Sequence, residues 1–381
     1  MKLKKILPQF LTLLFIVLIF GFFTMNAQEN MDTRGIEFGF GFLKQEASFD
    51  IQFSLIDYDG SKSYARAYLV GLLNTLLVSA IGIILCTILG VVIGVARLSP
   101  NYLINRTASV YIEFFRNIPL LLQIFFWYFA ALRALPMPED APLLLGSSFM
   151  TIKGFYTPSP VWINFDIFLI AIFISLIIIF FFNRFAKKKQ EEEGKQYPKF
   201  LISLGIFVII PALTFIVGGV DLSWSFPEIK QLAKTSFTYE GGVGIPPELI
   251  ALTLALTLYT ATFIAENVRA GIQGVGKGQK EAAASIGLTP GQVLKLVIMP
   301  QALRIIIPPT TNQYLNLTKN SSLAAAIAYP DLVLVFAGTA MMQTGRAIEI
   351  VAITMATYLT ISLSISVFMN WYNKRIAIKE K

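Results

Sequence analysis

Histidine is absent from this sequence of 381 residues, and cysteine occurs once, at Cys86. Zinc and haem sites and Cys–His catalytic pairs therefore lack their usual ligands or base, and no internal disulfide can form. Charged residues are also scarce, at 14% of the chain, where soluble domains carry about a quarter. The Asp and Glu residues lie mostly between the apolar segments and form no pair at helical spacing inside one. We therefore expect no catalytic residues, no metal and no cofactor.

Apolar residues make up 55% of the chain, which includes 32 Phe, and the mean hydropathy is +0.66. A helix that crosses a bilayer needs about 20 such residues in succession. The sequence thus predicts an all-α, polytopic membrane protein with about eight transmembrane helices. We place these helices at residues 6–26, 68–96, 108–134, 165–185, 199–219, 248–272, 305–337 and 347–371. The seventh is the longest and is polar in its middle.

Lysine and arginine predict the orientation, because basic residues collect beside cytoplasmic helix ends. They gather before the first span, in alternate loops and at the C-terminus: Lys2, Lys4, Lys5, Arg97, Arg106, Arg184, Lys187, Lys188, Lys189, Lys195, Lys199, Lys277, Lys280, Lys295, Arg304, Lys374, Arg375, Lys379 and Lys381. With eight spans all of these fall on one side, so both termini are predicted to be cytoplasmic. The net charge of +8 then reports membrane topology, and we expect no nucleic-acid partner.

The N-terminal segment has two interpretations. A Lys-rich start, an apolar run and Met25-Asn26-Ala27 are typical of a cleaved signal peptide. The apolar run is close to membrane-spanning length, however, which favours a first helix that is retained. The loops on the predicted outer side, at residues 28–64, 136–164 and 221–247, are too short for domains. We expect them to form a lid-like surface on which a soluble partner could land.

Residues 281–300 form a polar, Ala- and Gly-bearing stretch between two apolar segments. Glu281 is predicted in the first turn of a short Ala-rich helix, where a carboxylate suits the helix dipole. Gly287 suits the left-handed conformation that often ends a helix. Thr289-Pro290-Gly291-Gln292 then has the order of a capping box with proline at the first helical position. Two short helices joined by a tight turn would project as a compact knob.

This stretch resembles the EAA loop of ABC importer permeases, through Glu281, Ala282, Ala283, Gly287 and Pro300. Val297 and Met299 depart mildly from the pattern. The resemblance implies an ABC importer permease (MetI-like) fold in a bacterial inner membrane. It also implies that the loop, at about residues 275–303, docks into a cleft on a separate ATPase subunit. The plainer alternative is an amphipathic cytoplasmic loop that matches by chance.

Four further segments are similar to the polar amino-acid uptake branch of these permeases: Gly71-Leu72-Leu73-Asn74-Thr75-Leu76, residues 113–123, residues 262–272 and Lys319-Asn320-Ser321-Ser322-Leu323. An extra helix pair at 165–219 resembles the larger permeases of general L-amino-acid systems. The resemblance implies an amino-acid substrate, an extracytoplasmic amino-acid-binding protein and an identical or paralogous second permease. It also implies that the chain contacts membrane lipid. The expected organisation is an N-terminal helix and loop (1–64), a permease domain (65–375) and a cytoplasmic tail (376–381).

Polar residues inside the spans are candidates for the substrate pathway, because charge at the centre of a bilayer normally faces a cavity or a partner. Lys319 and its neighbours are suited to a substrate carboxylate, and Glu266 or Glu113 to a substrate ammonium. Pro119 breaks a backbone hydrogen bond, as in many transporter helices. Packing or helix-end anchoring explains the same residues equally or better. The candidates are Arg116, Asn117, Pro119, Glu266, Lys319, Asn320, Ser321 and Ser322.

Three functional classes remain open at this point. The first is a permease subunit of an ATP-driven importer of amino acids, with ATP hydrolysis on a partner. The second is a secondary amino-acid transporter driven by an ion gradient, for which Glu266 is a weak titrating candidate. The third is a membrane scaffold. Residues 271–278 nearly spell a phosphate-binding loop, but Gly278 replaces its hydroxyl residue and a membrane helix precedes it, so no ATP site is expected here.

Overall fold

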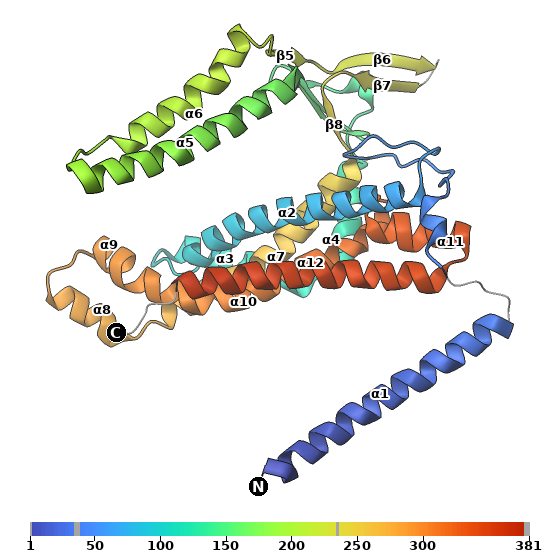
Figure 1. Cartoon of the computed structure of the whole chain (residues 1–381), viewed down its shortest axis with the longest axis horizontal. Coiled ribbons are helices and arrows are strands. Elements are labelled where there is room, and N and C mark those ends of the chain that lie inside the picture. Colours follow the sequence, from blue (N-terminus) through green and yellow to red (C-terminus); the bar gives the residue numbers. More distant parts are fainter. Residues whose placement is uncertain (1, 34–38, 234–235, 377–381) are drawn as a thin grey trace. The chain divides into compact units, whose positions relative to one another are not determined.

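The computed structural model describes residues 2–33, 39–233 and 236–376 and divides into two units (Figure 1). The helical unit comprises Met1–Tyr128 and Ala251–Lys381, and the inserted unit is Phe129–Ile250. The helical unit contains α1 (Lys2–Thr33), α2 (Tyr64–Ala96), α3 (Tyr102–Asn117), α4 (Leu120–Phe125), α7 (Pro247–Gln273), α8 (Lys277–Ser285), α9 (Pro290–Gln292), α10 (Met299–Asn320), α11 (Met341–Thr344) and α12 (Ala347–Ile376). Shorter 3-10 and π segments join them: η1 (Gly41–Lys44), η2 (Phe126–Leu132), η4 (Val293–Ile298), η5 (Ser321–Ile327) and η6 (Val333–Ala340). The boundary between the two units falls within η2 and within the first turn of α7. The predicted helical class is confirmed.

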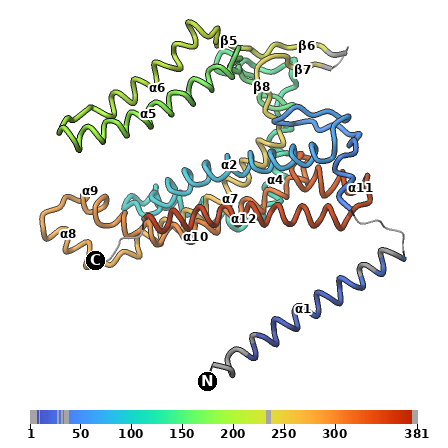
Figure 2. The backbone as a smooth tube through the Cα atoms, in the orientation of Figure 1, coloured from blue at the N-terminus to red at the C-terminus, as the bar shows by residue number. Residues whose placement is uncertain are grey.

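Small residues hold α2 against its neighbours in the helical unit. A Cβ added at Gly90 would lie 2.7 Å from the Ile264 Cβ, and one at Gly94 would lie 2.7 Å from the carbonyl oxygen of Ala265. Both contacts are with α7, so the backbones of α2 and α7 meet closely, as small residues allow in membranes. The tube in Figure 2 follows α2, α7, α10 and α12 as they run beside one another.

The predicted third span, 108–134, is not one helix. It consists of α3 and the segment Leu120–Leu132, which meet at an angle of 101°. Ile118, before Pro119, is extended, because proline disfavours the helical conformation in the preceding residue. The Gln123 side chain donates to the carbonyl oxygens of Phe115 (2.8 Å) and Ile118 (2.9 Å), two groups near the break. The expectation of a single span is therefore corrected to a broken pair.

The seventh predicted span, 305–337, is also divided. A long helical stretch, Pro290–Ile327, begins earlier than predicted and tightens into η5 at Ser321. Ala328 is left-handed, with φ of 60°, and the chain resumes as η6 at Val333. By length and composition, six helices of the described chain are suited to span a membrane, or seven if the bent pair counts as one. The predicted number of eight is thus approximate.

The inserted unit joins two helices to three small antiparallel sheets. Helices α5 (Phe165–Glu193) and α6 (Lys199–Ile216) pack against each other. The strands are β1 (Leu143–Leu144), β2 (Ser148–Thr151), β3 (Gly154–Thr157), β4 (Ser159–Ile163), β5 (Asp221–Ser225), β6 (Glu228–Ala233), β7 (Ser236–Glu240) and β8 (Val243–Ile245), ordered β1-β2-β3-β8, β4-β5 and β6-β7. A 3-10 turn, η3 (Pro138–Asp140), precedes them, and the buried Tyr239 hydroxyl donates to the Pro138 carbonyl oxygen (2.9 Å). The sequence predicted loops at residues 136–164 and 221–247, and it did not indicate these sheets.

Candidate coupling loop and translocation pathway

The coupling loop, residues 275–303, begins after α7 and projects at one end of the helical unit (Figure 1). Gly287 has a φ of +83°, and Thr289 and Gln292 form a complete capping box. The Thr289 backbone N–H donates to Gln292 Oε1 (2.9 Å), and the Gln292 backbone N–H donates to Thr289 Oγ1 (3.4 Å). The predicted left-handed conformation of Gly287 and the predicted capping box at Thr289 are both confirmed.

Two details of the loop differ from expectation. Helix α8 begins at Lys277, so Glu281 lies in its second turn and not beside the first N–H groups. The helix that follows the capping box is not short, because it continues through η4 into α10. The predicted boundary was wrong since the Lys-Gly-Gln-Lys segment at 277–280 is polar yet helical. The knob is therefore one isolated helix followed by the first turns of a long one.

The outer face of α8 is available to a partner. Glu281 and Ala282 are exposed, whereas Ala283 is buried where α8 packs against η4. Ile286 keeps 77% of its surface exposed at the tip, and sequence analysis did not single it out. An exposed apolar side chain beside small residues is typical of a protein contact surface. The half-buried Pro300 lies at the start of α10.

Both ends of the loop are held firmly. A Cβ at Gly271, near the end of α7, would lie 2.3 Å from Ile306 Cγ1 and 3.1 Å from the Ala302 carbonyl oxygen. The start of α10 therefore lies directly against the end of α7. The two helices that flank the loop therefore form one packed contact, and packed interiors of this kind transmit strain.

Of the candidate pathway residues, Lys319 is exposed and lies in the last turn of α10, where its charge suits the helix dipole. It forms no ion pair within the described part of the chain. Asn320 is half-buried at the junction with η5. The Ser321 and Ser322 hydroxyls donate to carbonyl oxygens of their own helix, those of Thr318 and Lys319, at 2.7 Å each. Lys319 is thus the free charged group of this segment.

The other candidates lie elsewhere. Glu266 pairs with Arg97 and Arg269, and the exposed Arg116 places its guanidinium 5.2 Å from the centre of the Phe263 ring. Asn117 and Pro119 are exposed at the break between α3 and α4. Leu317, two residues before Lys319, packs against Gly82. Gly82 and Arg97 are separated by about 22 Å along α2 at the rise of an α-helix. Glu266 thus lies far from Lys319, whereas α4, which follows the break at Pro119, contacts η5. The candidates therefore form two groups and not one site.

A buried polar network was missed by sequence analysis. Asp331 is fully buried and accepts a hydrogen bond from the Leu334 backbone N–H (2.8 Å). Thr75 Oγ1 accepts one from the Leu332 N–H (3.0 Å), and Asn74 donates to the Pro330 carbonyl oxygen (2.9 Å). The Gly-x-x-Asn-Thr segment of α2 thus fixes the turn between η5 and η6. The Gly-x-x-Asn-Thr motif could have indicated a buried polar contact in α2. The segment that it contacts, Pro330–Leu332, lies more than 250 residues away in sequence.

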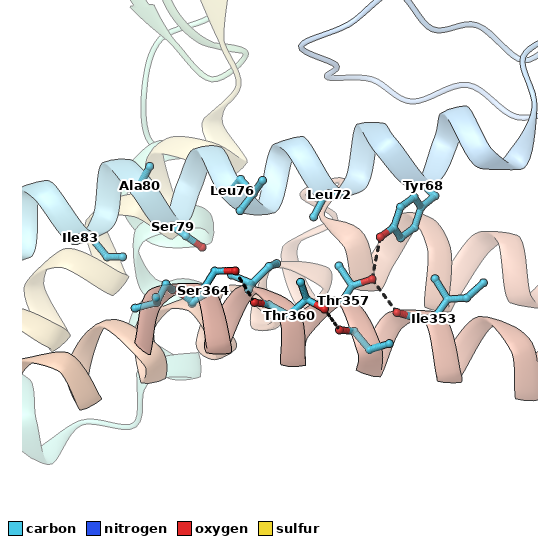
Figure 3. A pocket seen from close by; sticks show the side chains of 14 residues that line it. Tyr68, Leu72, Leu76, Ser79, Ala80, Ile83, Ile353, Thr357, Thr360 and Ser364 are labelled. Carbon is cyan, nitrogen blue, oxygen red and sulfur yellow. Dashed lines mark hydrogen bonds between the residues drawn. The ribbon is translucent and has the colours of Figure 1, made fainter. Parts of the chain in front are cut away.

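A groove of about 660 Å³ lies between α2 and α12, with Thr318 of α10 in its wall (Figure 3). The hydroxyl groups of Tyr68 and Thr357 form a hydrogen bond across it (2.8 Å). Thr360 and Ser364 donate to carbonyl oxygens of α12 itself, both at 2.8 Å. The fourteen lining residues include no charged side chain. The groove alone therefore offers no ion-pair partner to a charged substrate.

The long apolar helices of the described chain and the capped, projecting loop between two of them are the features of a multi-pass membrane protein. Residues 199–378 match the family described as binding-protein-dependent transport system inner membrane component. The chain is 48% identical to the putative amino-acid ABC transporter permease protein YhdX of Escherichia coli (strain K12), over 98% of this chain and 94% of that protein. The chain belongs to this family of inner-membrane permease components.

Two further relatives, AapQ and BztB, are also described as amino-acid permease proteins. The general L-amino acid transport system permease protein AapQ of Rhizobium johnstonii is 45% identical over 100% of this chain and 94% of its own length. The glutamate/glutamine/aspartate/asparagine transport system permease protein BztB of Rhodobacter capsulatus is 40% identical over 93% and 89%. A structure described as an amino acid ABC transporter with histidines has a TM-score of 0.48 and 21% identity, covering 82% of this chain and 95% of that one. Family membership confirms the predicted ABC permease subunit over an ion-driven carrier and makes the chain a transport subunit rather than an enzyme.

Proposed function

We propose that this chain is the permease subunit through which polar amino acids enter the cytoplasm, driven by an ATPase subunit bound at the coupling loop. The observation that carries the proposal is the preformed α8 knob, whose outer face is exposed while Ala283 fixes its inner face. The amino-acid cargo follows from the printed names of the relatives. Ordering a loop on binding costs free energy, so a knob that is already folded favours docking.

The expected orientation places α8 and both termini in the cytoplasm. Within the inserted unit, Lys187, Lys188 and Lys189 lie at the end of α5 that is remote from the strands. If this basic end is cytoplasmic, the sheets lie outside. There an extracytoplasmic amino-acid-binding protein would release its cargo. A second permease, identical or paralogous, would complete the pathway in the membrane.

The substrate pathway is proposed to include the polar break after α10. Lys319 is a free cation there, and a substrate carboxylate is a suitable partner for it. Asn320 and the break at Pro119 would contribute backbone and amide groups, as discontinuous helices do in other transporters. Ser321 and Ser322 would contribute acceptor capacity, because their hydrogens are already donated.

The coupling role is tested by Gly287→Arg in the intact transporter. We expect the variant to insert into the membrane normally and to lose the ATPase on purification, because the new side chain fills the docking face. Gly345→Arg is the matched control: Gly345 also has a positive φ (+67°) and also has nothing within 4 Å of an added Cβ, but it lies between α11 and α12. Retention of the ATPase by Gly287→Arg, or its loss from both variants, would contradict the proposed docking face.

A further inference from the structure

Glu266 lies on α7, two turns before the helix ends and the coupling loop begins. Its carboxylate contacts two guanidinium groups. Arg97, which caps the end of α2, pairs with Oε1. Arg269, one turn further along α7, donates from Nη2 (2.9 Å) and Nε (3.0 Å) to Oε2. One of these partners is on the same helix, and the other joins α7 to α2.

The α2 end of this contact is held to a third helix. The Asn105 side chain of α3 donates to the Arg97 carbonyl oxygen (2.5 Å). Beside it, Gly94 of α2 lies directly against Ala265 of α7. Any separation of α2 from α7 would break this close packing. The Glu266–Arg97 pair therefore lies where α2, α3 and α7 converge, two turns along α7 from the start of the coupling loop.

The charges around Glu266 do not suit a substrate ammonium. Both carboxylate oxygens already face arginine, so the three side chains carry a net positive charge. Arg116, which lies over Phe263 one turn earlier on α7, and Glu113 of α3 add one cation and one anion near Arg97, so the excess positive charge is unchanged. An incoming ammonium would be repelled by the excess charge. The side chain of Glu266 is 21% exposed, so this ion pair is shielded from much of the solvent.

We propose that Glu266 is a positioning residue that transmits movement of the coupling loop from α7 to α2 through Arg97. The inference rests on the proposed docking of an ATPase at α8. When α8 moves with the ATPase, the end of α7 moves with it, and the carboxylate carries Arg97 and the α2–α3 turn along. Arg269 contacts the same carboxylate from α7 itself, and its hydrogen bonds in the described part of the chain all go to residues of α7.

The test uses the whole transporter, with its ATPase, in proteoliposomes and measures amino-acid uptake per ATP hydrolysed. For Glu266→Gln and Arg97→Gln we expect this ratio to fall roughly fivefold, as for other residues that couple distant sites, with the ATPase still co-purifying. The double variant should be no worse than either single one. Arg97→Lys should restore most of the ratio. Arg269→Gln is the matched control and should stay within about twofold of the unaltered protein.

Several results overturn the role. An unchanged ratio in both Glu266→Gln and Arg97→Gln does so, and Arg97→Gln decides the matter if Glu266→Gln fails to accumulate. A raised KM for the amino acid with an unchanged kcat would instead make Glu266 a substrate contact. An effect of Arg269→Gln equal to that of Arg97→Gln would show that local charge matters and not the link to α2. If the unaltered chain retains no ATPase, the proposed function itself fails, which is a different result from an unchanged ratio.

Discussion

The two units of this protein use apolar helices in opposite ways. In α7 of the helical unit, 61% of an 18-residue apolar segment is buried, whereas in α6 of the inserted unit only 6% of the corresponding segment is buried. The mean hydropathy of the same two segments is lower for α7, at 1.7, than for α6, at 2.3. The more buried helix is thus the less apolar one. In a membrane, apolarity marks the surface that meets lipid or another subunit as much as the interior.

The composition of the two helices explains the difference. Beside large apolar residues such as Leu252, Leu256 and Ile264, helix α7 buries many small and hydroxyl-bearing residues, namely Ala251, Thr253, Ala255, Thr257, Thr260, Ala261, Thr262 and Ala265. Helix α6 exposes large ones, including Phe200, Leu201, Leu204 and Val208. Lipid chains are as apolar as leucine, so close fit and not hydrophobicity drives helix association in a bilayer. Steric changes should therefore act strongly in the helical unit and weakly in α6.

The largest expected effect is that of Gly94→Leu. The added Cβ would approach the Ala265 carbonyl oxygen and Val268, which forces α2 and α7 apart. Overpacking of this kind costs about 3 kcal/mol of folding free energy or more. Gly205→Leu in α6 is the control, since a Cβ there meets nothing within 4 Å. Thermal denaturation of the purified protein measures both, and equal losses would contradict the comparison.

A smaller loss is expected for Asp331→Ala. The change removes the acceptor for the Leu334 N–H inside the buried network, and an unsatisfied buried donor costs about 2 kcal/mol. Asp331→Asn retains an acceptor and should cost less. In the inserted unit, Asp221 accepts from its neighbour Leu222 on the surface, and Asp221→Ala should leave the melting temperature unchanged. A melting temperature that Asp331→Ala does not lower would show that the network adds no stability.

Lys319→Ala should leave stability unchanged and weaken uptake. If Lys319 holds a substrate carboxylate, its loss should raise the KM for the amino acid about tenfold, equivalent to about 1.4 kcal/mol. Lys230→Ala is the control in the inserted unit, where Lys230 forms an exposed pair with Glu240 (2.7 Å). Such pairs contribute little. Labelled amino-acid uptake at varied concentrations distinguishes the two, and an unchanged KM in Lys319→Ala would assign that lysine a structural role.

Local chemistry was readable from neighbouring residues. The capping box at Thr289 and the left-handed Gly287 depend on side chains within four positions, so their sequence fixes their conformation. The start of α8 was misplaced because its first turn is polar and carries no capping side chain. The break at Pro119 was visible, but the 101° bend and the Gln123 hydrogen bonds to carbonyl oxygens beside the break were not, since no local sequence pattern specifies them.

By itself, then, the sequence determined the membrane class, most of the helices, the turn and capping box of the coupling loop and the family to which the chain belongs. Only the tertiary structure decided which residues meet across the chain. It gave Glu266 its partner Arg97, Asp331 its neighbours on α2, and strand β3 its partner β8 some 90 residues later. The physical reason is that capping and turn conformations are set by adjacent residues, whereas ion pairs and sheet register exist only after distant segments have packed.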